Sequence, residues 1–115
     1  MNFKFNHGGR QFFFLTICVE GRRKILSRIQ RGAKRPALTR AGECVKALWG
    51  AIHSLNAALT ASDFVFMPDH VHLLLIVDYE QDRGFNPLVF SHWFMDESER
   101  MIATDGGLPP PRTPT

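Results

Sequence analysis

The chain has 115 residues, of which 44% are hydrophobic and 22% charged, and this is the size and composition of one ordinary folded domain. Its longest apolar runs fall far short of the roughly 20 residues that a spanning helix needs, which excludes a transmembrane protein. The first ten residues include Lys4, His7 and Arg10 instead of the apolar core of a secretory signal, so we expect a cytoplasmic protein. Cys18 and Cys44 form no CxxC pair, and we interpret them as buried reduced thiols.

The charge is distributed unevenly along the chain. Residues 1–62 hold 11 Lys and Arg against 2 acidic residues, a net charge of +9, whereas residues 63–115 hold 3 against 9, a net charge of −6. Residues 21–42 contain no acidic residue, a pattern that favours contact with a polyanion such as DNA, although solvated loops also carry basic runs. The basic residues of this segment are Arg22, Arg23, Lys24, Arg28, Arg31, Lys34, Arg35 and Arg40.

The first half of the chain predicts a strand, a loop and a helix. Residues 11–19 are aromatic, β-branched and almost continuously apolar, which predicts a central strand covered on both faces. Residues 20–36 are polar and basic and predict a long loop with short helical pieces. Thr39 can cap a following helix, because apolar residues recur at three-and-four spacing from Ala41 to Leu55. We expect this helix to pack against a sheet.

The second half predicts a hairpin and another helix. Residues 63–67 and 70–77 are apolar and flank a Pro-Asp turn. Pro87 can start a helix that reaches Ile102, while residues 105–115 contain four prolines and predict a flexible tail. The order strand, helix, strand, strand, helix predicts a ferredoxin-like α+β domain over residues 1–104, with helices on one face of an antiparallel sheet.

One pair of histidines stands out as a candidate metal site. Successive strand residues point to opposite faces, so His70 and His72 project from the same face and could bind one ion together. Neutral imidazole is a common ligand for divalent metals. The alternative is that two unliganded histidines simply occupy a strand, since a His-x-His spacing alone is a weak signal.

The surroundings of this pair resemble a known family. Residues 64–75 read Phe-Val-Phe-Met-Pro-Asp-His-Val-His-Leu-Leu-Leu and resemble the core motif of the IS200-like tyrosine transposases, including their REP-associated branch, within the HUH endonuclease superfamily. Thr16-Ile-Cys-Val, and Gly21-Arg22-Arg23 after it, are similar to the first strand and basic turn of that family. The resemblance extends from about Gln11 to Val77.

The resemblance implies a transposase that takes part in DNA transposition and recombination. Members bind single-stranded or hairpin DNA, commonly as homodimers, and nick it through a tyrosine nucleophile. By this resemblance His70 and His72 would hold Mg²⁺ or Mn²⁺ against the scissile phosphate, with the basic residues between Arg22 and Arg40 on the DNA.

The nucleophile and the third metal ligand depart from the family pattern. The single tyrosine, Tyr79, lies on the opposite strand face from His72 by its parity, and we interpret it as a strand-end aromatic rather than a nucleophile. Asp69 is expected to point to the other face as well. Three explanations stay open: truncation at the C-terminus, a change of reading frame after the hairpin, or a DNA-binding role without nicking. The residue types available as a third ligand are His92, Asp96, Glu97 and Glu99.

Two other functions stay open from the sequence. One is a non-catalytic nucleic-acid-binding ferredoxin-like domain with structural histidines, and the other is a small metal-binding or structural fragment without DNA affinity. Trp49 and residues 12–14 could stack on bases, but their helical and strand spacing favours core packing. His53 is expected at the surface or at the core boundary.

Overall fold

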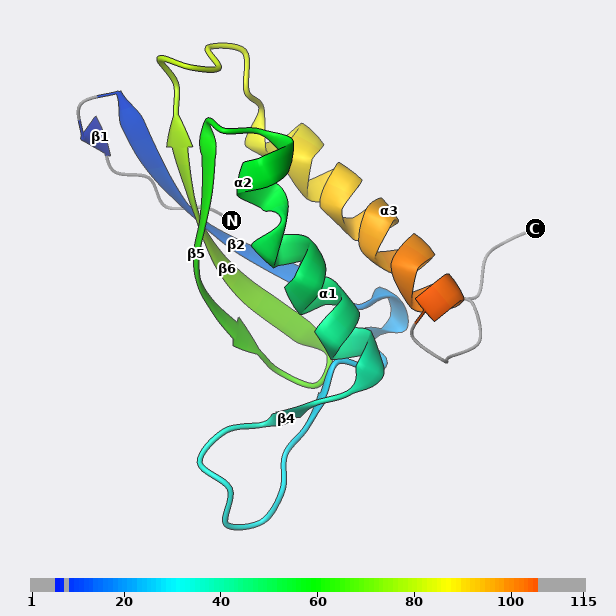
Figure 1. Cartoon of the computed structure of the whole chain (residues 1–115). Helices are drawn as coiled ribbons and strands as arrows, with labels where there is room; N and C mark the ends of the chain where they lie inside the picture. Colours follow the sequence, from blue (N-terminus) through cyan, green and yellow to red (C-terminus); the bar gives the residue numbers. More distant parts are fainter. Residues whose placement is uncertain (1–5, 8, 106–115) are drawn as a thin grey trace.

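The computed structural model describes residues 6–7 and 9–105, which form an antiparallel sheet with helices packed against one of its faces (Figure 1). This confirms the predicted α+β class. The strands lie in the order β1, β2, β6, β5. Their bounds are Asn6–His7 for β1, Arg10–Cys18 for β2, Leu59–Phe66 for β5 and His70–Asp78 for β6. The helices are α1 (Arg40–Gly50), α2 (Ile52–Leu55) and α3 (Pro87–Asp105). The predicted tail lies beyond residue 105, outside the described residues, except for Asp105 itself, which ends α3.

The strands and helices are connected as a split β-α-β unit, as in the ferredoxin-like arrangement that the element order predicts. The chain leaves β2, passes through α1 and α2, and enters β5, and β6 then returns between β2 and β5. Because β6 is antiparallel to both neighbours, β2 and β5 run parallel with one strand between them. The short β1 precedes β2 and pairs with its first residues. The sheet therefore has a helix-covered face and an open face (Figure 1).

The side chains of β2 alternate between these two faces, and the helices cover only one of them. The prediction that both faces of this strand are covered is therefore wrong. Phe13 and Leu15 are buried under the helices, whereas Phe14 between them is 46% exposed. Consecutive strand side chains point in opposite directions, and helices cover only one side of this sheet. A run of apolar residues thus leaves aromatic side chains on the open face.

The predicted hairpin is confirmed, and its first strand contains a bulge. The register between β5 and β6 shifts between Ala61 and Phe64, which leaves one extra residue on β5. The carbonyl of Ser62 in this bulge accepts a hydrogen bond of 3.1 Å from the indole Nε1 of Trp49. After the bulge the pairing is regular, and Phe64 and Phe66 share one face of β5 with ring centroids 5.5 Å apart.

The predicted helix after Thr39 is present but interrupted. It breaks at Ala51, whose φ of −91° and ψ of −4° separate α1 from α2. The buried stripe nevertheless continues from Val45 across the break to Ile52. Leu55 at the end of the predicted stripe is exposed, because the helix ends there and the chain turns towards β5.

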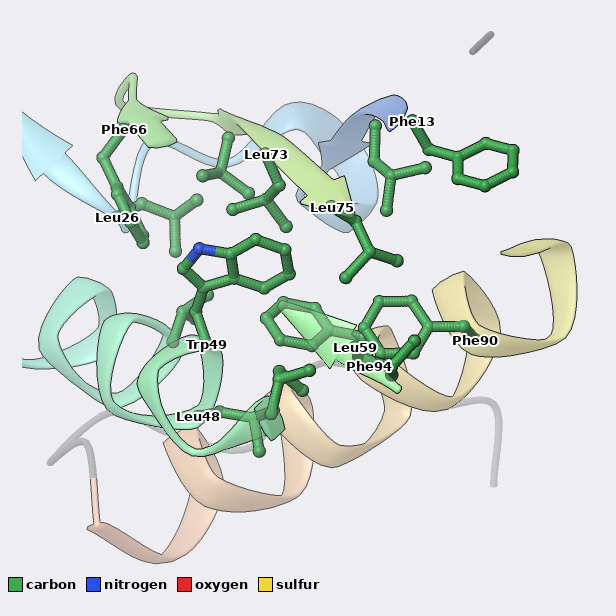
Figure 2. Close-up of a cluster of buried hydrophobic side chains, with 14 of the residues drawn as sticks. Phe13, Leu26, Leu48, Trp49, Leu59, Phe66, Leu73, Leu75, Phe90 and Phe94 are labelled. Carbon is green, nitrogen blue, oxygen red and sulfur yellow. The ribbon is translucent and has the colours of Figure 1, made fainter. Parts of the chain in front are cut away.

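The core lies between the sheet and the helices. Figure 2 shows Trp49 of α1 beside Phe94 of α3, with ring centroids 5.8 Å apart and an edge-on geometry. Phe90 stacks on Phe94 at 5.9 Å, and Leu73 and Leu75 of β6 are fully buried above them. The predicted core roles of Trp49 and Phe13 are confirmed, since each is only 2% exposed, whereas the same prediction is wrong for Phe14, which is 46% exposed.

The helix α3 matches the prediction at its start and along its buried face. The side chain of Asn86 accepts the backbone N–H of Leu88 at 2.9 Å and thereby caps the helix. Phe90, Phe94 and Ile102 are buried against the core. No helix among the described residues is long and apolar enough to cross a membrane.

The long loop after β2 forms a projecting arm. After a short helical turn at Glu20–Arg22, residues Ser27–Arg28 (β3) pair with Ala37–Leu38 (β4), and residues 29–36 extend beyond them (Figure 1). The arm returns to the start of α1, where Thr39 Oγ1 accepts the N–H of Gly42 at 3.0 Å. A Cβ atom at Gly42 would lie 2.0 Å from the carbonyl oxygen of Leu26. Only glycine therefore allows the arm and α1 to approach so closely.

Candidate functional site

The two histidines of β6 lie together on the open face of the sheet, as their spacing predicts. Their rings are 4.9 Å apart between centroids and nearly perpendicular. In the register of the sheet, Thr16 lies opposite His72 and Cys18 lies opposite His70. Cys18 is exposed on this face, so the prediction that both thiols are buried is wrong for Cys18, while Cys44 is half-buried. Neither takes part in a disulfide within the described residues.

Each histidine is oriented by a hydrogen bond at Nδ1. His70 Nδ1 lies 2.7 Å from Asp69 Oδ1, and because an ionised carboxylate only accepts, the imidazole N–H is the donor. His72 Nδ1 lies 3.0 Å from the hydroxyl oxygen of Thr16 on the neighbouring strand. A carboxylate at Nδ1, as at His70, fixes the ring and the tautomer of metal-binding histidines and leaves Nε2 as the ligand atom. The Thr16 hydroxyl can donate or accept, and it orients the ring of His72.

Asp69 connects the histidine pair to the basic segment, and the prediction that it points away from the pair is wrong. The residue belongs to the turn before β6, where strand alternation does not apply. Its second carboxylate oxygen accepts a hydrogen bond of 3.0 Å from Arg22 Nε. The hydrogen bond from His70, and then that from Arg22, lower the pKa of Asp69 from 3.8 to about 2. Asp69 is therefore an ionised link between the two groups at neutral pH.

The basic arm is attached to the same end of the sheet. The N–H of Leu26 donates to the carbonyl of Pro68 at 2.9 Å, and the N–H of Val19 donates to the carbonyl of Asp69 at the same distance. These bonds join the base of the arm to the turn that precedes His70. All eight predicted DNA-binding residues are exposed: Arg22, Arg23, Lys24, Arg28, Arg31, Lys34, Arg35 and Arg40.

The side chains considered as a third metal ligand do not join the pair. His92, Asp96, Glu97 and Glu99 belong to α3, which packs on α1 and on the helix-covered side of β2 (Figure 1). Glu99 has a raised pKa because it is partly buried and faces Glu20 and Asp96. Within residues 6–7 and 9–105, no cluster of three His, Cys, Asp or Glu side chains is arranged to hold a metal ion.

The chain's tyrosine also lies on the other side of the sheet. Tyr79 follows β6, and its ring contacts Phe13 at 6.5 Å and Phe85 at 6.2 Å between centroids. Burial raises the pKa of its hydroxyl. Ser91 of α3 donates a hydrogen bond to the carbonyl of Pro87, and Ser98 of the same helix is buried, with no hydrogen-bond partner for its hydroxyl among the described residues.

Sequence reasoning missed Thr16 as a partner of His72. The two residues are 56 positions apart, and their contact depends on the pairing of β2 with β6. One signal was available in the sequence: Thr16 is two residues from Phe14 and four from Phe12, so the three side chains share one face of the strand. That signal does not say which residue of another strand lies opposite Thr16. His53 is exposed as predicted, with its Nδ1 2.7 Å from the carbonyl oxygen of Leu59.

Comparison with family models and with curated proteins gives no match to this chain. The likeness to the IS200-like transposases therefore rests on the motifs around His70 and on the basic turn after β2.

Proposed function

We propose that this protein binds single-stranded or hairpin DNA in the manner of the HUH endonucleases, with a divalent metal ion at His70 and His72. The observation that supports the proposal is the pair of hydrogen bonds at Nδ1, to the Asp69 carboxylate and with the Thr16 hydroxyl, which leave both Nε2 atoms outside these bonds. The acid-free basic segment begins beside this pair, which suits a phosphate backbone that approaches the metal.

The donor set fits an incomplete metal site. Two imidazole nitrogens would hold the ion, and water or phosphate oxygens would occupy the remaining positions, since the described residues offer no third side chain. Imidazole suits Mn²⁺ better than Mg²⁺, which prefers oxygen ligands. When bound, such an ion supplies Lewis-acid polarisation of a phosphoryl oxygen. The chain would position the ion through His70 and His72, whose rings are oriented by Asp69 and Thr16.

We propose that the protein binds DNA but that none of its described side chains acts as a nucleophile beside the metal. Nicking and strand transfer by the family mechanism require a tyrosine hydroxyl in line with the scissile phosphate. The single tyrosine, Tyr79, packs against Phe13 on the helix-covered side. We therefore propose a transposase-like DNA-binding protein of the cytoplasm, acting as a homodimer, that has lost the ordinary nucleophile of its family.

Metal binding tests this proposal directly. Isothermal titration with Mn²⁺ should show one site in the wild type and none in the His70→Ala, His72→Ala double variant, while affinity for hairpin DNA without metal stays largely unchanged. His53→Ala is the matched control, because His53 is exposed on α2 and distant from the pair in the fold. Equal Mn²⁺ binding by the wild type and the double variant would reject the site.

A second function is favoured by the absence of a third ligand among the described residues. In this alternative, the protein is a non-catalytic nucleic-acid-binding ferredoxin-like domain, and Asp69 and Thr16 simply satisfy two structural histidines. It predicts that EDTA leaves both DNA affinity and thermal stability unchanged. The metal-dependent proposal predicts that Mn²⁺ raises both.

A further inference from the structure

A small cavity lies on the helix-covered side of the sheet, between the end of β2 and the second half of α3. It has a volume of about 60 Å³, and the first residues of the arm and one residue of α1 complete its wall. The chain around Glu20 lies beside the end of α3 here (Figure 1). Most of the lining is apolar and includes Ile17, Ile25, Val45, Val71, Phe94 and Ile102. Because Val71 points to the opposite face from His70 and His72, the sheet separates this cavity from the histidine pair.

Charged side chains line the solvent side of the cavity. Glu20 and Glu99 contribute carboxylates and Arg23 contributes a guanidinium, and Glu20 and Arg23 are exposed. Glu99 is partly buried, and its pKa is raised by this burial and by the negative charges of Glu20 and Asp96. Arg23 opposes this effect only in part. The carboxylates therefore favour a cation at this position.

The hydroxyl of Ser98 is an independent sign of a bound molecule. Ser98 lines the cavity and is 8% exposed, and its Oγ has no hydrogen-bond partner among the described residues. Buried polar groups nearly always have such a partner, so an unpaired hydroxyl in a cavity wall calls for one. A serine hydroxyl can donate and accept, and it turns between staggered positions. It can therefore bond to a polar group placed in the cavity.

The volume of the cavity limits the size of its ligand. A cavity of roughly 150 Å³ in a protein core accommodates a benzene ring, and the cavity beside Ser98 has less than half of that volume. An aromatic ring is therefore too large, whereas a short hydrocarbon chain can contact the apolar wall. A short chain that carries a positive charge matches both the wall and the carboxylates.

We propose that this cavity binds a small primary ammonium compound, with a short hydrocarbon chain against the apolar wall and the ammonium group beside Glu20 and Glu99. An ammonium group has three donors, which suits two carboxylates and the Ser98 hydroxyl. Two sources share this chemistry: a simple alkylamine, and a small apolar amino acid whose carboxylate would pair with Arg23. Neither the histidine pair nor DNA takes part, so the site is independent of the proposed function.

An NMR titration of the full ¹⁵N-labelled chain with isobutylamine tests the site without any variant. Isobutylamine should shift the amide signals of residues 17–26 and 94–102, which surround the cavity, and leave those of β5 unchanged. Isobutanol is the matched ligand, because it has the same hydrocarbon chain and no charge. It should bind at least about tenfold more weakly, since hydrogen bonds to charged groups are the stronger ones.

Two substitutions test the polar groups. Glu99→Gln keeps the shape of the side chain and removes its charge, and it should weaken isobutylamine binding about tenfold. Glu97→Gln is the matched control on the same helix, because Glu97 pairs with Arg100 and is not part of the lining. Ser98→Ala should weaken the binding of isobutylamine and of isobutanol alike, about fivefold.

Valine distinguishes the two sources, because it is isobutylamine with an added carboxylate. Tighter binding of valine than of isobutylamine, lost in Arg23→Gln, would support the site and assign it to an amino acid. Tighter binding of isobutylamine would support it and assign it to an amine. Amide shifts away from the cavity or none with either compound, equal binding of isobutanol, or unchanged binding in Glu99→Gln would overturn the proposal. The proposed function would still stand, since these titrations involve neither metal nor DNA.

Discussion

Thr16 and His72 face each other across the β2–β6 pairing, with 3.0 Å between the hydroxyl oxygen and the imidazole Nδ1. His70 has a similar contact, because its Nδ1 lies 2.7 Å from a carboxylate oxygen of Asp69. Each histidine thus has a hydrogen-bond partner at Nδ1, which comes from the neighbouring strand for His72 and from the preceding turn for His70. Two rings on adjacent positions of one strand face are thereby held with their Nε2 atoms outside these bonds.

Loss of the Thr16 hydroxyl should weaken metal binding without unfolding the protein. In Thr16→Val the side chain keeps its β-branched shape, and His72 loses the partner that fixes the orientation of its ring. Because outer-shell partners of this type typically contribute about 10- to 100-fold in metal affinity, we expect a Mn²⁺ dissociation constant raised by about tenfold or more in isothermal titration. Thr60→Val on the same face, at an exposed position opposite Ile76, is the control. An unchanged constant in Thr16→Val would show that Thr16 does not orient a ligand.

The Asp69 carboxylate should make stability depend on pH in the acid range. Its pKa is lowered from 3.8 to about 2 in the folded protein by His70 and Arg22, so its contribution is present above the unfolded value and is lost as the pH falls towards 2. The difference in free energy of unfolding between wild type and Asp69→Asn should therefore shrink between about pH 4 and pH 2. Urea unfolding at a series of pH values measures it. A difference that stays constant over this range would contradict the assignment.

Gly42→Ala should destabilise the fold at the joint between the arm and α1. The added Cβ would lie 2.0 Å from the Leu26 carbonyl oxygen, which is backbone and cannot rotate away. We expect a loss of about 2 kcal/mol or more in the free energy of unfolding, measured by chemical denaturation. Gly50→Ala is the matched control in the same helix, because nothing lies within 4 Å of its Cβ position, and it should be neutral or stabilising. Similar results for both variants would disagree with the close approach at Gly42.

Neutralising the arm should reduce the salt dependence of DNA binding. The variant with Arg28→Gln, Arg31→Gln and Arg35→Gln removes three exposed charges. For single strands, the slope of log affinity against log salt concentration should become shallower by about 2, since each phosphate contact contributes about 0.7. Arg83→Gln is the control, an exposed arginine in the turn after β6, at the other end of the sheet (Figure 1). An unaltered slope in the triple variant would place the DNA elsewhere.

Local sequence patterns were sufficient to predict the elements that carry the site. Period-two alternation put His70 and His72 on one face, the Pro-Asp pair marked the turn before them, and three-and-four spacing predicted α1 and α3. The basic segment was visible because charge is a property of residues and needs no fold. These signals act over a few residues, and such short-range features survive in the folded chain.

The partners of the histidines and the sidedness of the sheet were decided only by the tertiary structure. Thr16 meets His72 across 56 residues because the register of β2 against β6 is set by the burial of Phe13 and Leu15 beneath the helices. The same packing places α3, with its acidic residues, on the face opposite the histidines, and leaves Phe14 exposed. An almost continuous apolar run such as residues 11–19 does not reveal which of its two faces the helices will cover, because that choice depends on contacts between segments far apart in the chain.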